Sequence, residues 1–400
     1  MKKIISFIMA VMLTATTYGF VGTNENFGAS TVYAAEAFNS DDFEIKNNVI
    51  VKCSNQEIRS VVIPDNIVGI EPEAFKGCTE LETVEMTNSV RWIGENAFQY
   101  CFSLKDVTVS SFITNGEKVF SDCENEWSIE NGYSSDGFNV TFSDSEITKY
   151  EEEDEADFHS DMYVRDSAFR DCKYVKSVNI PEKYICIEPE AFKGCTELET
   201  VEMTNSVRWI GENAFQYCFS LKDVTVSSFI TNGEEVFSDC IIDWSIENGY
   251  SSDGFNVRFS DSEITKYEKE DEADFHSDMY VRSSAFQDCE YVKSVFIPEN
   301  YVYVEDGAFV HCSNLRKATL PSTLKKYDNN AFAYSPTVIS VTGATIGDTN
   351  NDGSLTSADL MRLRKYLLGN DMTIMNSDMN QDDRINIIDM IKLIGLFLDE

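Results

Sequence analysis

Residues 70–86, IEPEAFKGCTELETVEM, and residues 93–109, IGENAFQYCFSLKDVTV, share one pattern at a spacing of 23 residues. In both, an isoleucine is followed at equal offsets by Ala-Phe-x-x-Cys-x-x-Leu-x-x-Val. The Ala-Phe-x-x-Cys core returns at residues 168–172, 191–195, 214–218, 285–289 and 308–312. Apolar residues at fixed offsets with a period of about 20–29 residues are typical of a solenoid that stacks its turns around one core. The pattern predicts a repeat solenoid of short β-strands joined by loops and short helices.

This motif resembles the BspA-like leucine-rich repeats of bacterial surface proteins, and the resemblance covers roughly residues 45–340. We expect the solenoid to occupy residues 36–342. A second, coarser repeat lies within it, because residues 70–186 and 187–303 differ at only thirteen positions. A duplicated binding face gains avidity when both copies reach one ligand, whereas a catalytic pocket gains little from being copied. The duplication therefore favours recognition over catalysis.

Two tandem loops near the C-terminus place oxygen side chains at positions 1, 3, 5, 9 and 12 and a backbone carbonyl at position 7. The first loop supplies Asp348, Asn350, Asp352, Ser354, Thr356 and Asp359, and the second supplies Asp378, Asn380, Asp382, Arg384, Asn386 and Asp389. This spacing surrounds a hard cation with about 6–8 oxygens, so we predict one Ca²⁺ ion in each loop. Position 6 is Gly353 in the first loop and Asp383 in the second. Because a sharp turn there favours a positive φ, we expect the second loop to bind calcium more weakly.

The Asp at position 12 and the single helix after each loop distinguish these motifs from an EF-hand. Together with Gly347-Asp348 they resemble the type I dockerin, over residues 345–400. The resemblance implies a small all-α module of two loop–helix motifs that folds with calcium and binds a cohesin on a cellulosome scaffold. Carried over by position, the cohesin contacts fall at Ser357, Ala358, Arg364, Lys365, Ile387, Ile388 and Ile394. Any of the three isoleucines could instead pack inside the module. One half is polar and basic and the other aliphatic, which disfavours interchangeable docking of the two halves.

The N-terminus predicts export. Lys2 and Lys3 precede an apolar stretch, and Ala34 and Ala35 supply small residues, so residues 1–35 are typical of a secretory signal peptide. No later stretch approaches the roughly 18 apolar residues of a membrane-spanning helix, and we expect a soluble extracellular protein. The formal net charge of −37 argues against nucleic acid and anionic membranes as partners.

Nine of the eleven cysteines occupy one repeat position, and Cys53 and Cys186 lie outside that frame. In a solenoid this position stacks inward, where a thiol packs as a small apolar side chain. We expect a ladder of buried free thiols, although neighbouring rungs could also approach bonding distance.

Trp92 and Trp209 are the first candidates for a glycan-binding surface, because their offset in the repeat is expected to point outward. Tyr100 and Tyr217 also lie next to a core cysteine. An exposed ring can stack on a sugar face. The same rings could instead cover the solenoid edges and fill gaps between rungs.

Catalysis finds little support in the sequence. The three histidines are His159, His276 and His311, and no metalloprotease, nucleophile-elbow or phosphate-loop motif is present. We expect the acidic runs at residues 151–157 and 268–274 to be solvated loops. They could instead be weak calcium sites or surfaces that attract a basic partner by their charge. We therefore expect a non-catalytic recognition protein for a polysaccharide, cell-surface or protein ligand. The alternatives are a dockerin-bearing glycoside hydrolase and a structural spacer or adhesin.

Overall fold

The computed structural model describes most of residues 38–398. The described ranges are 38–124, 126–133, 137–147, 162–251, 253–264, 279–328, 330–369, 374–382 and 384–398. The predicted signal peptide, the two acidic runs, His159, His276 and Asp383 lie outside them.

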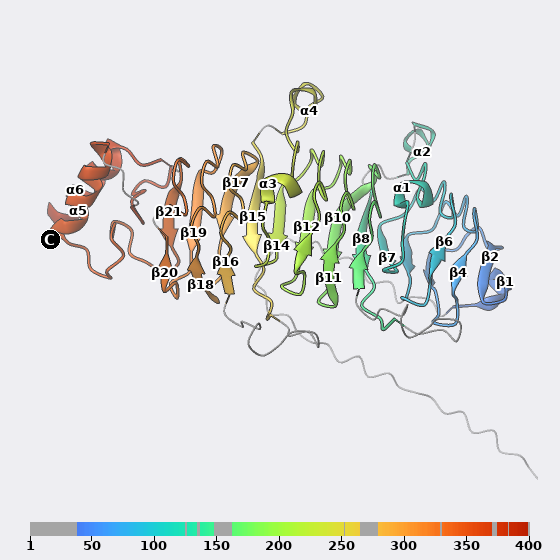
Figure 1. Cartoon of the computed structure of the whole chain (residues 1–400). Helices are drawn as coiled ribbons and strands as arrows, with labels where there is room; N and C mark the ends of the chain where they lie inside the picture. Colours follow the sequence, from blue (N-terminus) through green and yellow to red (C-terminus); the bar gives the residue numbers. More distant parts are fainter. Residues whose placement is uncertain are drawn as a thin grey trace, which may run out of the picture. The chain divides into compact units, whose positions relative to one another are not determined.

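One parallel sheet of eleven strands runs along the repeats (Figure 1). Its strands, in spatial order, are β21 (Val338–Val341), β19 (Lys317–Leu320), β17 (Val292–Phe296), β15 (Phe255–Phe259), β14 (Asp223–Val226), β12 (Thr200–Met203), β10 (Val175–Ile180), β8 (Phe138–Phe142), β7 (Asp106–Val109), β5 (Thr83–Glu85) and β3 (Ser60–Val62). The register aligns one buried residue per strand, from Val61 through Val84 and Val107 onward to Ile339. Because β-branched residues suit a pleated surface, this inward column follows directly from the repeat.

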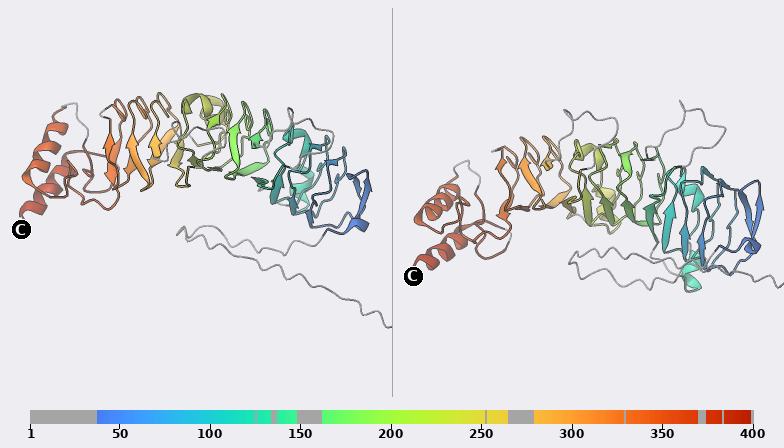
Figure 2. Two further views of the ribbon diagram at one scale, coloured as in Figure 1. Left: turned by 60° about the horizontal axis from the view of Figure 1, so that its bottom comes forward. Right: turned by 90° about the horizontal axis from the view of Figure 1, so that it is seen from below.

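Three smaller sheets form a second side of the repeats, and their strands stay stacked side by side in both further views (Figure 2). The first contains β1 (Phe43–Lys46), β2 (Val49–Cys53), β4 (Gly69–Ile70) and β6 (Trp92–Ile93). The second contains β9 (Met162–Val164), β11 (Tyr184–Ile187) and β13 (Trp209–Ile210). The third contains β16 (Met279–Val281), β18 (Tyr301–Val304) and β20 (Lys326–Tyr327). All pairs are parallel except the hairpin of β1 and β2, which follows a 3-10 turn at Ser40–Asp42.

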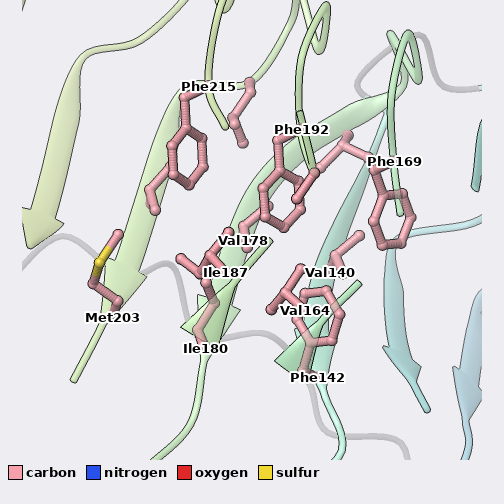
Figure 3. Close-up of a cluster of buried hydrophobic side chains, with 14 of the residues drawn as sticks. Val140, Phe142, Val164, Phe169, Val178, Ile180, Ile187, Phe192, Met203 and Phe215 are labelled. Atoms are coloured by element: carbon pink, nitrogen blue, oxygen red, sulfur yellow. The ribbon is translucent and has the colours of Figure 1, made fainter. Parts of the chain in front are cut away.

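The Ala-Phe-x-x-Cys turns close each rung and fill the core with stacked rings. Phe169, Phe192 and Phe215 are fully buried, with ring centroids 5.9 and 5.1 Å apart (Figure 3). Similar stacks continue in both directions, from Phe75 to Phe120 and from Phe286 to Phe332. Aromatic pairs at such distances contribute about 0.5–1.5 kcal/mol beyond their buried area, so the stack is a major source of stability.

The repeat cysteines form the ladder of free thiols that the sequence predicted. Six of these thiols donate to the phenylalanine carbonyl of the preceding rung, as in Cys195 to Phe169 at 3.2 Å. The hydroxyl of Ser335, which replaces the cysteine in the last rung, donates to Phe309 in the same way at 2.6 Å. Cys53, although outside the sequence frame, is also fully buried in this core, whereas Cys186 is half-buried on β11.

The irregular part of each 117-residue block contains two short helices and one strand of the main sheet. The helices are α1 (Gly116–Val119) and α2 (Glu126–Glu130) in the first block, and α3 (Gly233–Val236) and α4 (Asp243–Glu247) in the second. Asn88 is fully buried beneath this region. Its amide group donates to the carbonyls of Ser143 and Ser145 and accepts from the Ser111 N–H, at 2.7–3.0 Å. The stretch is therefore a degenerate rung joined to its neighbours.

Beyond the last rung, two helices form the C-terminal module: α5 (Ser357–Leu367) and α6 (Ile387–Leu398). Asn376 connects this module to β21. Its backbone N–H donates to the Ile339 carbonyl at 2.7 Å, and its side-chain oxygen accepts from the Val341 N–H at 2.8 Å. Met375 forms a parallel β-bridge with Ile339. None of the helices in the described residues is long and apolar enough to cross a membrane.

Candidate functional site

The C-terminal module is built from two similar loop–helix motifs around a small core. Leu363 of α5 and Leu393 of α6 are fully buried, and Ile374 joins them. Leu355 and Ile385, both at position 8 of their loops, pack against this cluster. Each loop is therefore attached to the core immediately before its helix begins.

The first loop is organised around the carboxylates of Asp348 and Asp359. Asp348 accepts from the N–H groups of Asp352 and Gly353 at 3.1 and 2.8 Å. Asp359 accepts from the N–H groups of Thr349 and Thr356 at 2.9 and 2.8 Å. Thr356 is also the N-cap of α5, since its hydroxyl accepts from the Ala358 N–H. The last two predicted ligands, Thr356 and Asp359, thus close the loop and start the helix.

The second loop repeats this geometry. Asp382 donates its N–H to Asp378 at 3.2 Å, and Asp389 accepts from the Met379 and Asn386 N–H groups at 2.9 and 2.7 Å. The side-chain oxygen of Asn380, at position 3, is buried without a hydrogen-bond partner. A buried oxygen of this kind needs a donor or a cation.

The chemistry of both loops fits Ca²⁺. Asp348, Asp359 and Asp389 are almost fully buried, and buried carboxylates require compensation. Within the described residues no three acidic, histidine or cysteine side chains gather at one point. A calcium shell does not depend on acids alone, because amide oxygens and backbone carbonyls supply part of it. Position 6 of the first loop has φ = +84° at Gly353, as expected of the sharp turn.

The predicted cohesin contacts lie mostly on the surface. Ser357, Ala358, Arg364 and Lys365 are exposed on α5. On α6, Ile387 and Ile388 are 55% and 49% exposed, whereas Ile394 is half-buried. Sequence reasoning missed Ile391, which is 60% exposed and follows Ile387 and Ile388 at the i+3 and i+4 spacing of one helix face. That spacing was the available signal. These isoleucines form an exposed apolar strip on α6.

Trp92 and Trp209 point outward from the small sheets, with 40% and 50% of their surface exposed. A Cβ atom on Gly69 would lie 2.2 Å from the Trp92 ring, so this ring lies directly over the neighbouring rung. Other outward rings continue the column, and we call the set the aromatic stripe: Trp92, Tyr163, Trp209, Tyr280 and Tyr303. Tyr100 and Tyr217 lie elsewhere, at turn positions with positive φ.

Two arginine clusters interrupt the aromatic stripe. In the first, the guanidinium carbons of Arg91 and Arg165 lie 4.3 and 5.3 Å from the Phe112 ring centroid. In the second, Arg208 and Arg282 lie 4.0 and 4.9 Å from the Phe229 ring. Sequence analysis missed both clusters because their members are far apart in the chain.

The remaining histidine in the described residues shows no catalytic arrangement. His311 is exposed and lies 2.9 Å from the carboxylate of Asp288. Hydrogen bonds from Gln287 and His311 lower the pKa of Asp288. The contact is an exposed side-chain hydrogen bond rather than a base held in an enclosed site.

Comparisons with known proteins agree with this architecture. The BspA type leucine rich repeat region matches residues 44–156, 162–267 and 279–352 in six copies, and the dockerin type I domain matches residues 346–398. No curated protein matches the chain as a relative. These two matches confirm the predicted solenoid and dockerin.

Several solved structures of leucine-rich repeat proteins are similar to this chain. The leucine-rich repeat protein of T. pallidum is 17% identical, with 70% of this chain and 90% of that chain covered and a TM-score of 0.30. A leucine-rich cell surface protein from Faecalibacterium prausnitzii is 20% identical, with 77% and 93% covered and a TM-score of 0.25. The family match alone spans more than half of the sequence. The chain therefore belongs to the BspA-type leucine-rich repeat family and ends in a type I dockerin domain.

Proposed function

We propose that this protein is a secreted, non-catalytic recognition subunit of a cellulosome. Its leucine-rich repeats bind a polysaccharide, and its dockerin holds the chain on a cohesin of the scaffold. Type I dockerins are calcium-binding modules, and a dockerin implies a cohesin partner. The combination of repeat region and dockerin supports a protein that is anchored outside the cell.

The observation that carries the polysaccharide proposal is the pair of exposed tryptophans on the aromatic stripe. Large apolar side chains are normally buried. Trp92 in the first copy of the duplicated block is nonetheless 40% exposed, and its counterpart Trp209 in the second copy is 50% exposed. A flat, exposed indole matches the apolar face of a pyranose ring. Two such rings on one surface also provide two contacts for one polymer.

The dockerin proposal assigns one calcium ion to each loop. Asp348, Asp352 and Asp359 would hold the first ion with Asn350, Thr356 and the Ser354 carbonyl. Asp378, Asp382 and Asp389 would hold the second with Asn380, Asn386 and the Arg384 carbonyl. The calcium charge would compensate the buried carboxylates, so binding and folding are coupled.

Depletion of the protein from solution tests the polysaccharide proposal. The full chain, with calcium, is mixed with insoluble plant cell-wall polysaccharides, and we expect saturable binding. A variant carrying Trp92→Ala and Trp209→Ala should bind roughly 5- to 150-fold more weakly, since each stacked ring contributes about 0.5–1.5 kcal/mol. The matched control is Trp244→Ala, which removes a tryptophan that is 53% exposed on α4, outside the aromatic stripe.

Two results would contradict this proposal. Release of reducing sugars by the purified chain would identify a carbohydrate-active enzyme. Absence of binding to every polysaccharide would leave a cell-surface component or a protein as the ligand.

A further inference from the structure

The aromatic stripe is distributed over three separate sheets, and its rings occupy aligned strand positions within the second and third of them. Tyr163 pairs with Cys186, and Cys186 pairs with Trp209 on the next strand. Tyr280 pairs with Tyr303 in the third sheet, and their rings meet edge to face at 6.0 Å. Aligned positions on parallel strands recur about every 4.8 Å along the stack. Within the second and third sheets, the outward rings therefore lie at aligned positions of parallel strands.

Each arginine cluster surrounds a phenylalanine, Phe112 or Phe229, on a rung that carries no strand of the small sheets. Arg91 immediately precedes Trp92, and Arg165 lies two residues after Tyr163. Both guanidinium groups reach the Phe112 ring, which belongs to the rung between them. Arg165 also lies 5.7 Å from the Tyr163 ring. The second copy repeats this arrangement, with Arg282 at 5.9 Å from Tyr280.

An arginine stacked on an aromatic ring is held in orientation. The ring covers one face of the planar guanidinium, and the N–H groups lie around its edge, where a carboxylate binds in bidentate fashion. Arg165 is further fixed by its Nε donor, which lies 3.4 Å from the Ser111 carbonyl. A guanidinium held in this way suits a planar anion better than the mobile ammonium group of a lysine would.

The charge distribution makes this arrangement unusual. The chain has 32 basic and 69 acidic residues, and four of its eleven arginines lie in these two clusters. A strongly acidic protein repels polyanions at long range. Arg165 and Arg282 place two of these cationic groups beside the outward rings of Tyr163 and Tyr280.

We propose that the aromatic stripe and the two arginine clusters form one site for an acidic polysaccharide that carries carboxylates, such as a polyuronate. Trp92 and Trp209 stack on sugar faces. Arg165 and Arg282 bind carboxylates of the same chain. This inference rests on the proposed polysaccharide-binding function and specifies its ligand class.

The duplication gives the site a preferred ligand length. Trp92 and Trp209 are separated by four rungs, or about 19 Å at the spacing of parallel strands. A ligand shorter than this span contacts one tryptophan and one arginine cluster. A longer chain contacts both copies, so the second contact forms at a high effective concentration. Affinity should therefore rise steeply at the length that bridges the two copies.

The test measures binding of the calcium-loaded full chain to polygalacturonate, to its oligomers of graded length and to a neutral soluble β-glucan. We expect polygalacturonate to bind more tightly than the neutral glucan, and salt to weaken its binding. A variant with Arg165→Gln and Arg282→Gln should lose at least about tenfold in affinity for polygalacturonate, because charge-assisted hydrogen bonds are lost. Binding of Arg165→Lys with Arg282→Lys should be intermediate, because the charge remains without the planar fork. Trp209→Ala should abolish the length-dependent step while short oligomers still bind.

The matched control is Arg258→Gln. Arg258 also stacks on a phenylalanine, with its guanidinium carbon 4.5 Å from the Phe296 ring, but it lies in the main sheet. Thermal unfolding of every variant checks that the fold is retained. Equal polygalacturonate affinity of the Arg165/Arg282 variants and the Arg258 control would overturn the inference. Preference for the neutral glucan would also overturn it, while leaving the proposed function intact. Failure to bind any polysaccharide would contradict both this inference and the proposed function.

Discussion

At the residue scale, the repeat cysteine combines two properties that a solenoid core needs. Its side chain is small and apolar enough to stack beside phenylalanine, and its thiol satisfies a carbonyl that the turn leaves inside the core. Burial raises the pKa of Cys172 and of Cys289 to about 12, from the usual value of 9.0. These two thiols are therefore protonated at neutral pH and poor nucleophiles.

This ladder predicts alkaline sensitivity. In the unfolded chain the thiols ionise near pH 9, whereas in the folded chain they remain protonated to about pH 12. The stabilising contribution is complete below pH 9 and is lost as the pH rises toward 12. We expect the denaturation midpoint in urea to be nearly constant from pH 7 to about 8.5 and to fall steeply above pH 9. A midpoint that stays level to pH 11 would show that the thiols are not buried in this way.

At the element scale, the sequence predicted the contacts that repeat with the rungs. It did not predict the contacts that depend on loops of irregular length. The inward apolar residue of each strand, a valine in most of them, and the phenylalanine of each turn recur at fixed offsets, so the stack follows from the sequence alone. The pairing of Arg165 with Phe112 does not follow from the sequence, because the rungs are spaced unevenly along the chain. The aligned positions of the main sheet in this region are residues 106, 139, 177 and 200. The loop between such rungs decides which side chains meet, and its length follows no repeat.

The same contrast applies to the exposed apolar strip on α6, where Ile391 falls outside the positions that the dockerin resemblance implies. We expect Ile391→Ala to weaken binding to a type I cohesin by roughly tenfold, since burying an isoleucine contributes about 1.5–3 kcal/mol. The control is Lys392→Ala, one position along the same helix. Isothermal titration calorimetry provides the measurement, and equal affinities of the two variants would exclude Ile391 from the interface.

At the scale of the whole molecule, the solenoid and the dockerin have separate hydrophobic cores, and both proposed calcium ions lie in the dockerin. Chelation with EDTA should therefore abolish cohesin binding and the helical signal of α5 and α6, while the main unfolding transition of the repeats persists. Circular dichroism with and without calcium distinguishes the two contributions. A single transition that shifts as a whole with calcium would mean that the two cores unfold together.

The contact of Met375 and Asn376 with β21 has a consequence for self-association. A terminal strand of a parallel array presents unpaired N–H and C=O groups, and such an edge can recruit a strand from another copy. In this chain, residues just before the second calcium loop cover part of that edge, with hydrogen bonds to Ile339 and Val341. These contacts leave less of the edge open to a strand from another copy.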